Sequence, residues 1–293
     1  HDIDATSIVL GNGSNDVLEL IARCFLGPGR NAVFSEYAFA VYPLASLATG
    51  ADLRIAPALA KDSDMPYGHD LNALLAQVNA ETGVVFIANP NNPTGTWLDP
   101  EAIANFLKAV PSQVVVVLDE AYFEYMQVAL RPDSRSLLEQ HENLVVTRTF
   151  SKVHGLAGLR MGYGLASPVI ADLLNRVRQP FNANSAAMAA AIAALDDTDH
   201  VARSVAANQA GLQQVLSGLQ ALGLRTLPTQ ANFLTFELGS NAAAINDALL
   251  RAGVILRPLA SYAMPDYLRV TIGTEQENQR FLQVLSQLLE QAA

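Results

Sequence analysis

The chain has 293 residues, of which 51% are hydrophobic and 16% charged, so it can bury a large core in one or two domains. Its formal net charge of −10 argues against binding to nucleic acid or to an anionic membrane surface. The single cysteine, Cys24, excludes a disulfide within the chain, and no run approaches the roughly 20 apolar residues that a membrane span requires.

Short apolar runs alternate with amphipathic stretches over the first 180 residues. The expected strands are Ser7–Leu10, Asn31–Phe34, Asp52–Ala56, Gly83–Ala88, Val114–Leu118, Leu144–Thr147 and Met161–Ala166. The expected helices between them include Val17–Phe25, Leu71–Val78 and Pro100–Ala109. Near-continuous runs of Val and Ile separated by helices are typical of a mostly parallel sheet that helices cover on both faces.

The pattern changes after Pro180. Residues 185–223 are rich in Ala and predict helix over their whole length. The remaining chain predicts strands Phe233–Glu237, Val254–Ile255 and Leu268–Ile272, a helix Ala242–Ala252, and a closing helix from Glu275. We therefore expect an α/β protein with a large domain over residues 1–200 and a smaller α+β domain over residues 201–293.

Four polar motifs follow expected strands, at the edge where open parallel sheets bind ligands. GNGSND (11–16) joins a strand to a helix, so Gly13 and the free N–H groups that follow could bind an anion. The same letters also make ordinary turns and helix caps. NPNNPTG (89–95) could place the amide of Asn92 against a ligand oxygen, or could be only a turn.

The other two motifs carry charge. DEAY (119–122) ends a buried strand in Asp119, which could cap a turn or hold the ring nitrogen of a ligand protonated. TFSK (149–152) contains Lys152, whose amine pKa would fall in a closed site beside Arg160, making it a nucleophile for carbonyl carbon. An isolated Ser-Lys is usually a surface dipeptide, but four such motifs at four strand ends favour one shared site.

Five segments resemble, in this order, the class I/II aminotransferases of fold type I, which depend on pyridoxal 5'-phosphate (PLP). They are GNGSND, NPNNPTG, LDEAYFEY, RTFSKVHGLAGLRMGY and YLRVTIGT. The likeness covers essentially the whole chain and, within the family, is closest to the histidinol-phosphate aminotransferases. It implies a large PLP-binding domain built on a mostly parallel seven-stranded sheet flanked by helices, and a smaller C-terminal α+β domain, as in aspartate aminotransferase.

The resemblance also implies a role for each matching residue. Lys152 would bind PLP covalently and later move a proton between the substrate Cα and C4' of the cofactor. Asp119 would pair with the pyridinium nitrogen, Asn92 and Tyr122 would donate to the phenolic oxygen, and Tyr37 would stack on the ring. The phosphate would be bound by Gly13, Ser14, Asn15, Thr149, Ser151 and Arg160.

The implied reaction transfers the amino group of L-histidinol phosphate to 2-oxoglutarate, giving imidazole acetol phosphate and L-glutamate. Arg269 would bind the anionic group of the substrate, with Asn92 nearby. Arg257 would be a second arginine for a substrate phosphate, although its spacing to Arg269 differs by one residue from that of some relatives. No metal is expected, and neither Cys24 nor His154 is assigned a role.

Three alternatives stay open at this point. An aromatic amino-acid aminotransferase or a threonine-phosphate decarboxylase would have nearly the same cofactor residues, and a non-catalytic binding protein could keep the fold. The resemblance further implies a cytoplasmic homodimer. Relatives carry several tens of residues before the VLGNGSND strand that line the substrate pocket, and we expect that this chain is a trimmed form.

Overall fold

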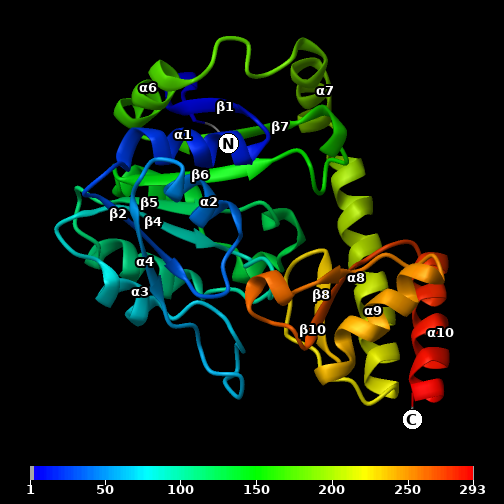
Figure 1. The fold of residues 1–293 in the computed structure, drawn as a ribbon. Coiled ribbons are helices and arrows are strands. Elements are labelled where there is room, and N and C mark those ends of the chain that lie inside the picture. The colour runs from blue at the N-terminus through cyan, green and yellow to red at the C-terminus, as the bar shows by residue number, and fades with distance from the viewer. Residues whose placement is uncertain (1–2, 293) are drawn as a thin grey trace.

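A seven-stranded sheet forms the centre of the first half of the chain (Figure 1) in the computed structural model, which describes residues 3–292. The strand order is β1-β7-β6-β5-β4-β2-β3. Strands β2 to β6 run parallel, whereas β7 is antiparallel to both of its neighbours. This confirms the predicted fold class. The strands are β1 Ile8–Asn12, β2 Asn31–Ser35, β3 Asp52–Ala56, β4 Thr82–Ala88, β5 Val115–Asp119, β6 Leu144–Thr149 and β7 Met161–Ala166.

Helices cover both faces of this sheet because its central strands are apolar on both sides. In β4, Val84 and Phe86 face the layer of α1, α2 and α6, whereas Val85 and Ile87 face the layer of α3, α4 and α5. Aspartates begin all three helices of the second layer by accepting backbone N–H bonds. The helices are α1 Ser14–Phe25, α2 Val41–Leu47, α3 Leu71–Gln77, α4 Pro100–Ala109, α5 Ser134–Gln140 and α6 Pro168–Val177.

The Ala-rich stretch forms two helices and not one. α7 (Ser185–Asp196) ends at Asp197, whose carboxylate accepts the N–H of His200 over 2.9 Å and so begins α8 (Thr198–Ala221). An aspartate that caps the next helix competes with continuation of the first one. Figure 1 shows α8 running from the seven-stranded sheet to the second, smaller sheet.

The second sheet is antiparallel, with the order β8-β10-β9. Its strands are β8 Phe233–Glu237, β9 Arg257–Pro258 and β10 Tyr267–Thr271, and α8 packs on it with α9 (Ala242–Arg251) and α10 (Glu275–Ala292). The division into a large domain over residues 1–200 and a smaller one over residues 201–293 stays a prediction. Short 3₁₀ helices lie at Ala5–Ser7, Phe123–Tyr125, Val128–Leu130, Ala157–Leu159, Gly239–Asn241 and Ala260–Tyr262.

One predicted strand is wrong. Val254–Ile255 is not a strand, and the pairing begins two residues later, where Arg257 lies opposite Arg269. The reason is the end of α9: Gly253 has a φ of 80° and the N–H of Val254 bonds to the carbonyl of Leu249. Residues 253–256 therefore end the helix and turn the chain, and pairing with β10 can begin only after them.

The two lobes meet at the loop that follows β4. The Thr235 hydroxyl of β8 donates to the Pro93 carbonyl over 2.7 Å, and the Gln230 N–H donates to the Gly95 carbonyl over 3.1 Å. A Cβ on Gly95 would lie 2.4 Å from the Thr229 hydroxyl, so only glycine allows this approach. None of the described helices is long and apolar enough to cross a membrane.

Candidate active site

A cavity of about 180 Å³ lies at the carboxyl ends of β4, β5 and β6, next to the start of α1. The four motifs of the sequence analysis meet here although up to 150 residues separate them in the chain, as expected for parallel strands of one sheet. Its wall is formed by Ser14, Asn15, Phe39, Ala88, Pro90, Asn92, Asp119, Ala121, Tyr122, Thr149, Ser151, Lys152 and Arg160.

One end of the cavity is suited to an anion. Gly13, with a φ of 77°, precedes the twelve-residue helix α1, whose first residues Ser14 and Asn15 line the wall. Arg160 adopts a left-handed backbone conformation with a φ of 58°, and its guanidinium lies against Gly13. A Cβ on Gly13 would be 2.4 Å from Arg160 Nη2. The Ser151 hydroxyl lies 3.4 Å from Arg160 Nη1. This end of the cavity therefore combines helix N–H groups, an arginine and a hydroxyl, all of which can bind an anion.

The floor of the cavity holds a buried carboxylate. Asp119, the last residue of β5, is 5% exposed and accepts hydrogen bonds from the Tyr42 and Thr147 hydroxyls, both over 3.1 Å. The Ala121 N–H lies 3.3 Å from the same oxygen as Thr147. Burial raises the pKa of Asp119, and the bonds from Tyr42 and Thr147 act in the opposite direction. All three donors are neutral, so the negative charge has no bonded counter-ion.

Lys152 lies on the wall of the same cavity, and its positive charge lowers the pKa of Asp119. Its Nζ is 5.0 Å from the centroid of the Tyr122 ring, which in turn contacts Phe233 of the second sheet edge-on. Among the residues that the structure describes, the amine has no hydrogen bond or salt bridge. The backbone that follows is held by His200 of α8, whose Nε2 lies 3.0 Å from the Val153 carbonyl. The lysine is thus fixed at its backbone and free at its amine.

The two predicted substrate arginines lie on adjacent strands of the second sheet, just outside the wall. Arg269 of β10 donates from Nη1 to Asn92 Oδ1, and its guanidinium lies 4.7 Å from the centroid of the Phe233 ring. Its Nε is buried and without a partner among the described residues, and burial lowers the pKa of its guanidinium. Arg257 lies opposite it in register and is exposed. The pair therefore offers positive charge beside Asn92.

Tyr37 is the one predicted cofactor residue whose side chain lies away from this wall. Its ring contacts Tyr67 edge-on, with centroids 5.0 Å apart, and belongs to a cluster between the two lobes. Besides Tyr122, the aromatic side chain that lines the cavity is Phe39, two residues after Tyr37. Stacking by Tyr37 stays a prediction, and Phe39 is the aromatic residue that the structure offers for this position.

Sequence reasoning missed the residues that hold Asp119. Tyr42 lies 77 positions before Asp119 in a short apolar helix, and nothing in its sequence context distinguishes it from a core tyrosine. Thr147 had a detectable signal. It is the last residue of a predicted strand and lies two residues before Thr149, so its side chain points to the same face as that of Thr149.

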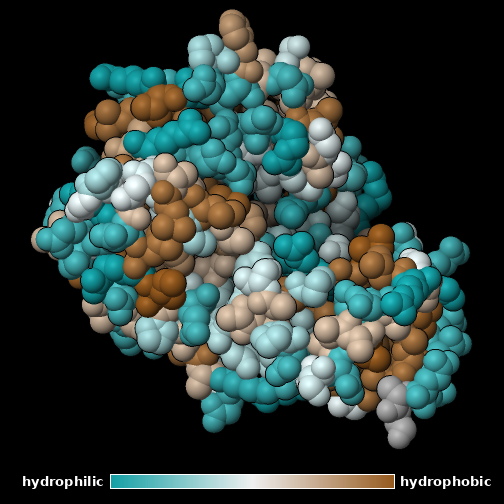
Figure 2. Space-filling view, in the orientation of Figure 1, coloured by the Kyte–Doolittle hydropathy of each residue, from teal (hydrophilic) through white to brown (hydrophobic). Residues whose placement is uncertain are grey.

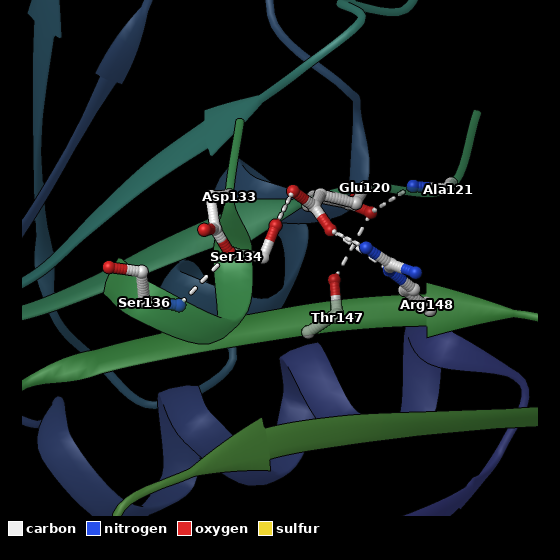
Figure 3. Close-up of polar contacts among 8 residues, drawn as sticks. Glu120, Ala121, Asp133, Ser134, Ser136, Thr147 and Arg148 are labelled. Carbon is white, nitrogen blue, oxygen red and sulfur yellow. Dashed lines mark hydrogen bonds and ion pairs between the residues drawn. The ribbon is translucent and has the colours of Figure 1, made fainter. Parts of the chain in front are cut away.

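Behind the cavity floor lies a second buried carboxylate, Glu120. Figure 3 shows it between Ser134 and Arg148, with Thr147 on the neighbouring strand. Arg148 Nη2 and Nε donate to Glu120 Oε2 over 2.7 and 2.9 Å, and the Ser134 hydroxyl donates to Oε1 over 2.5 Å. Burial alone would lower the pKa of Arg148, but the Glu120 carboxylate raises it overall. This pair is neutralised and structural.

The geometry defines what the site can do. The cavity has an anion-binding end, a buried carboxylate that can pair with a cation, and a lysine on its wall. It is therefore suited to a ligand that carries a negative group, a positive group and a carbonyl group. An amine beside such a carbonyl is suited to nucleophilic addition and to proton transfer. Within the described residues, no group of His, Cys, Asp and Glu side chains could hold a metal ion.

Known proteins resemble the chain over nearly its full length. The family model for "Aminotransferase class I and II" matches residues 1–285. Histidinol-phosphate aminotransferase 2 of Pseudomonas fluorescens is 54% identical over 290 residues, which are 99% of this chain and 77% of that protein. Histidinol-phosphate aminotransferase 1 of Dechloromonas aromatica is 55% identical over 98% of this chain and 77% of that protein.

Solved structures agree with the fold. The histidinol-phosphate aminotransferase of Sinorhizobium meliloti, in complex with pyridoxal-5'-phosphate, has a TM-score of 0.90 and 30% identity over 98% of this chain and 78% of that one. A putative histidinol-phosphate aminotransferase from Erwinia carotovora atroseptica reaches a TM-score of 0.92 at 26% identity, over 100% of this chain and 84% of that one. The family model and the relatives together show that this chain belongs to the class I and II aminotransferases.

Proposed function

We propose that this chain is a PLP-dependent aminotransferase that moves the amino group of L-histidinol phosphate to 2-oxoglutarate. The observation that carries the proposal is the single cavity lined by Lys152, by the start of helix α1 and by the carboxylate of Asp119. The names of relatives at 50–55% identity support the choice of substrate.

The side chains of the cavity fit PLP at both ends. Its phosphate would lie on the start of α1 beside Gly13, where a Cβ would collide with Arg160. Its pyridine nitrogen would face Asp119, and Asn92 and Tyr122 would donate to its phenolic oxygen. The phosphate ligands would be Ser14, Asn15, Thr149, Ser151 and Arg160.

Bound PLP supplies a carbonyl that bonds to amines and a ring that accepts electrons when the Cα proton leaves. The protein would supply the rest. Lys152 would hold and then release that proton, because its amine is free of other partners on the cavity wall. Asp119 would keep the pyridine nitrogen protonated, and Arg160 would fix the phosphate so that the carbonyl reaches the lysine.

Two arginines would bind the substrates. Arg269 has a buried, unpartnered Nε and an Nη1 already oriented by Asn92, so it is suited to a carboxylate or a phosphate at the cavity mouth. Arg257, opposite it on β9, adds a second positive charge that a doubly charged phosphate monoester would use. Glutamate and 2-oxoglutarate would use the same arginines in the second half of the reaction.

The test is a transamination panel on the PLP-loaded protein with histidinol phosphate, phenylalanine and threonine phosphate as donors. We expect the highest kcat/KM for histidinol phosphate. A higher value for phenylalanine would contradict the substrate, and release of CO₂ from threonine phosphate would contradict the reaction. Borohydride treatment should attach the mass of the reduced cofactor to Lys152, and Lys152→Ala should lose both the label and the activity.

Assembly and location belong to the same proposal. We expect the protein to be cytoplasmic, as a biosynthetic enzyme would be. We also expect a homodimer, because several large apolar side chains lie exposed. Figure 2 shows hydrophobic surface over α2, where Leu44 and Leu47 are 66% and 57% exposed, and Phe181 is 97% exposed before α7. Light scattering should give twice the mass of the chain. We also propose that residues 1–200 and 201–293 are the two domains.

A further inference from the structure

A hydroxyl behind the cavity contacts the carboxylate at its floor. Tyr42 lies in the first turn of α2, and its side chain is 0% exposed. Its hydroxyl donates to Asp119 Oδ2 over 3.1 Å, while Thr147 donates to the other oxygen, Oδ1. Because Tyr42 does not line the cavity, its hydroxyl would act on a ligand bound there through Asp119, the group to which it donates.

The ring of Tyr42 is held by three phenylalanines. It stacks on Phe86 with centroids 4.9 Å apart and an interplanar angle of 10°. Phe39 contacts it edge-on at 5.8 Å, and Phe34 is 6.5 Å away. A buried tyrosine hydroxyl in such a cage needs a polar partner, and Asp119 is the partner that the structure gives it. The cage therefore fixes the direction from which Asp119 receives its hydrogen bond.

The contacts of Asp119 show what this bond does. Its bonded donors are neutral, so they stabilise the charged carboxylate without cancelling its charge. The other titratable groups that act on the pair are Lys152, which lowers the pKa of Asp119, and Tyr122 and Tyr262, which raise that of Tyr42. Two hydroxyls on two oxygens also fix the plane of the carboxylate relative to the cavity.

We propose that Tyr42 is a positioning residue that keeps Asp119 ionised and correctly oriented for a cationic ring nitrogen. The ligand named here rests on the proposed function, whereas the contact between Tyr42 and Asp119 does not. Without the hydroxyl, Asp119 would take up a proton more readily and would rotate more freely. The ring nitrogen of the bound cofactor would then lose its anionic partner.

The test is Tyr42→Phe, which keeps every ring contact in the cage. In the PLP-free protein, infrared difference spectra against Asp119→Asn should show the Asp119 carboxyl pKa shifted upward. In the loaded enzyme kcat should fall by roughly 10- to 100-fold, as expected for one hydrogen bond to a charged group, with KM changed less than about threefold. Thr82→Val, which removes a buried hydroxyl at the start of β4, the end of that strand opposite the cavity, is the control and should keep the wild-type kcat.

A double variant separates positioning from a merely structural role. In the Asp119→Asn background, Tyr42→Phe should cause no further loss of kcat, because its effect passes through the carboxylate. Full addition of the two losses, or an unshifted Asp119 pKa in Tyr42→Phe, would overturn the inference. If the wild-type protein neither binds PLP nor transaminates, the proposed function fails, and the Asp119 pKa in the PLP-free protein still decides the role of Tyr42.

Discussion

Asp119 and Glu120 are consecutive in the chain and both buried, but their surroundings are opposite. Asp119 receives hydrogen bonds from Tyr42 and Thr147 and has no bonded cation. Glu120 is bound by both Arg148 Nη2 and Nε, with Ser134 on its other oxygen. Figure 3 shows the second arrangement. Because side chains alternate along an extended chain, the two carboxylates point away from each other.

Because of this difference, two neighbouring carboxylates at the end of β5 are suited to different roles, one in binding a ligand and the other in stabilising the fold. A buried charge that already has its counter-ion holds the strands together and is unavailable to a ligand. A buried charge that has only neutral donors is costly to the empty protein, and the cost is recovered when a cation binds. The contrast supports the proposal that Asp119 binds the ligand and that Glu120 stabilises the fold.

The largest expected effect is on catalysis. Asp119→Asn should lower kcat by about 10²- to 10⁴-fold, corresponding to loss of a buried charge pair of about 3–5 kcal/mol with the cofactor. The melting temperature of the PLP-free protein should stay the same or rise, because an unneutralised buried charge is removed. Steady-state kinetics and thermal unfolding measure the two. Loss of stability with retained kcat would reverse the assignment of the two carboxylates.

Removing the counter-ion of Glu120 should lower the stability of the fold. Arg148→Met leaves Glu120, which is 0% exposed, without its counter-ion, and should lower the free energy of unfolding by about 3–5 kcal/mol. Urea unfolding of the PLP-free protein measures it. Arg176→Met is the matched control, because it breaks an exposed pair with Asp172 and should cost less than about 1 kcal/mol. Equal losses in both variants would show that burial of the Glu120 pair is unimportant.

His69, which is buried next to the end of β4, shows the effect of burial on a titratable group that has only a neutral partner. His69 makes no ion pair with any residue that the structure describes. Its Nε2 lies 3.1 Å from the Ala88 carbonyl, and burial lowers its pKa from 6.5 to about 4. Between these two values the unfolded chain binds a proton that the folded protein does not. Unfolding free energy should therefore rise with pH over this window, by up to about 3 kcal/mol from this group.

His69→Gln should remove that contribution. The quantity to measure is the difference in unfolding free energy between wild type and variant from pH 4 to pH 7. The difference is needed because the raised pKa values of Asp119 and Glu120 make stability fall as pH rises through their own windows. A difference that does not change with pH would show that His69 is protonated equally in both states.

The smallest effect is expected when both partners of the buried pair are replaced. Glu120→Gln with Arg148→Met leaves no unpaired charge, so the double variant should lie within about 1–2 kcal/mol of wild type and be more stable than Arg148→Met alone. Its kcat should be close to that of wild type, because Asp119 keeps Tyr42 and Thr147. A double variant as unstable as the single one would mean that packing of the arginine over Phe123 supports this region, not the ion pair.

The pattern of apolar residues in the sequence predicted much of the fold. The runs of Val and Ile that become β4, β5 and β6 predict buried parallel strands, and the motifs after them converge because parallel strands end at one edge. The strand predicted at Val254–Ile255 failed, because the turn that ends α9 is a local event that hydrophobicity does not report. The break at Asp197 was missed because high helix propensity continues on both sides of it.

The sequence by itself identified the candidate groups for the chemistry: Lys152, Asp119, Asn92, Tyr122 and Arg160 stand in motifs whose order resembles that of the aminotransferases. Only the tertiary structure decided which charges are available, since the sequence does not show that Glu120 is paired with Arg148 whereas the bonded partners of Asp119 are neutral. The partners that distinguish them, Tyr42 on α2 and Arg148 on β6, come from other elements. Local pattern specifies the face on which a side chain lies, whereas its neutralisation depends on contacts between residues far apart in the chain.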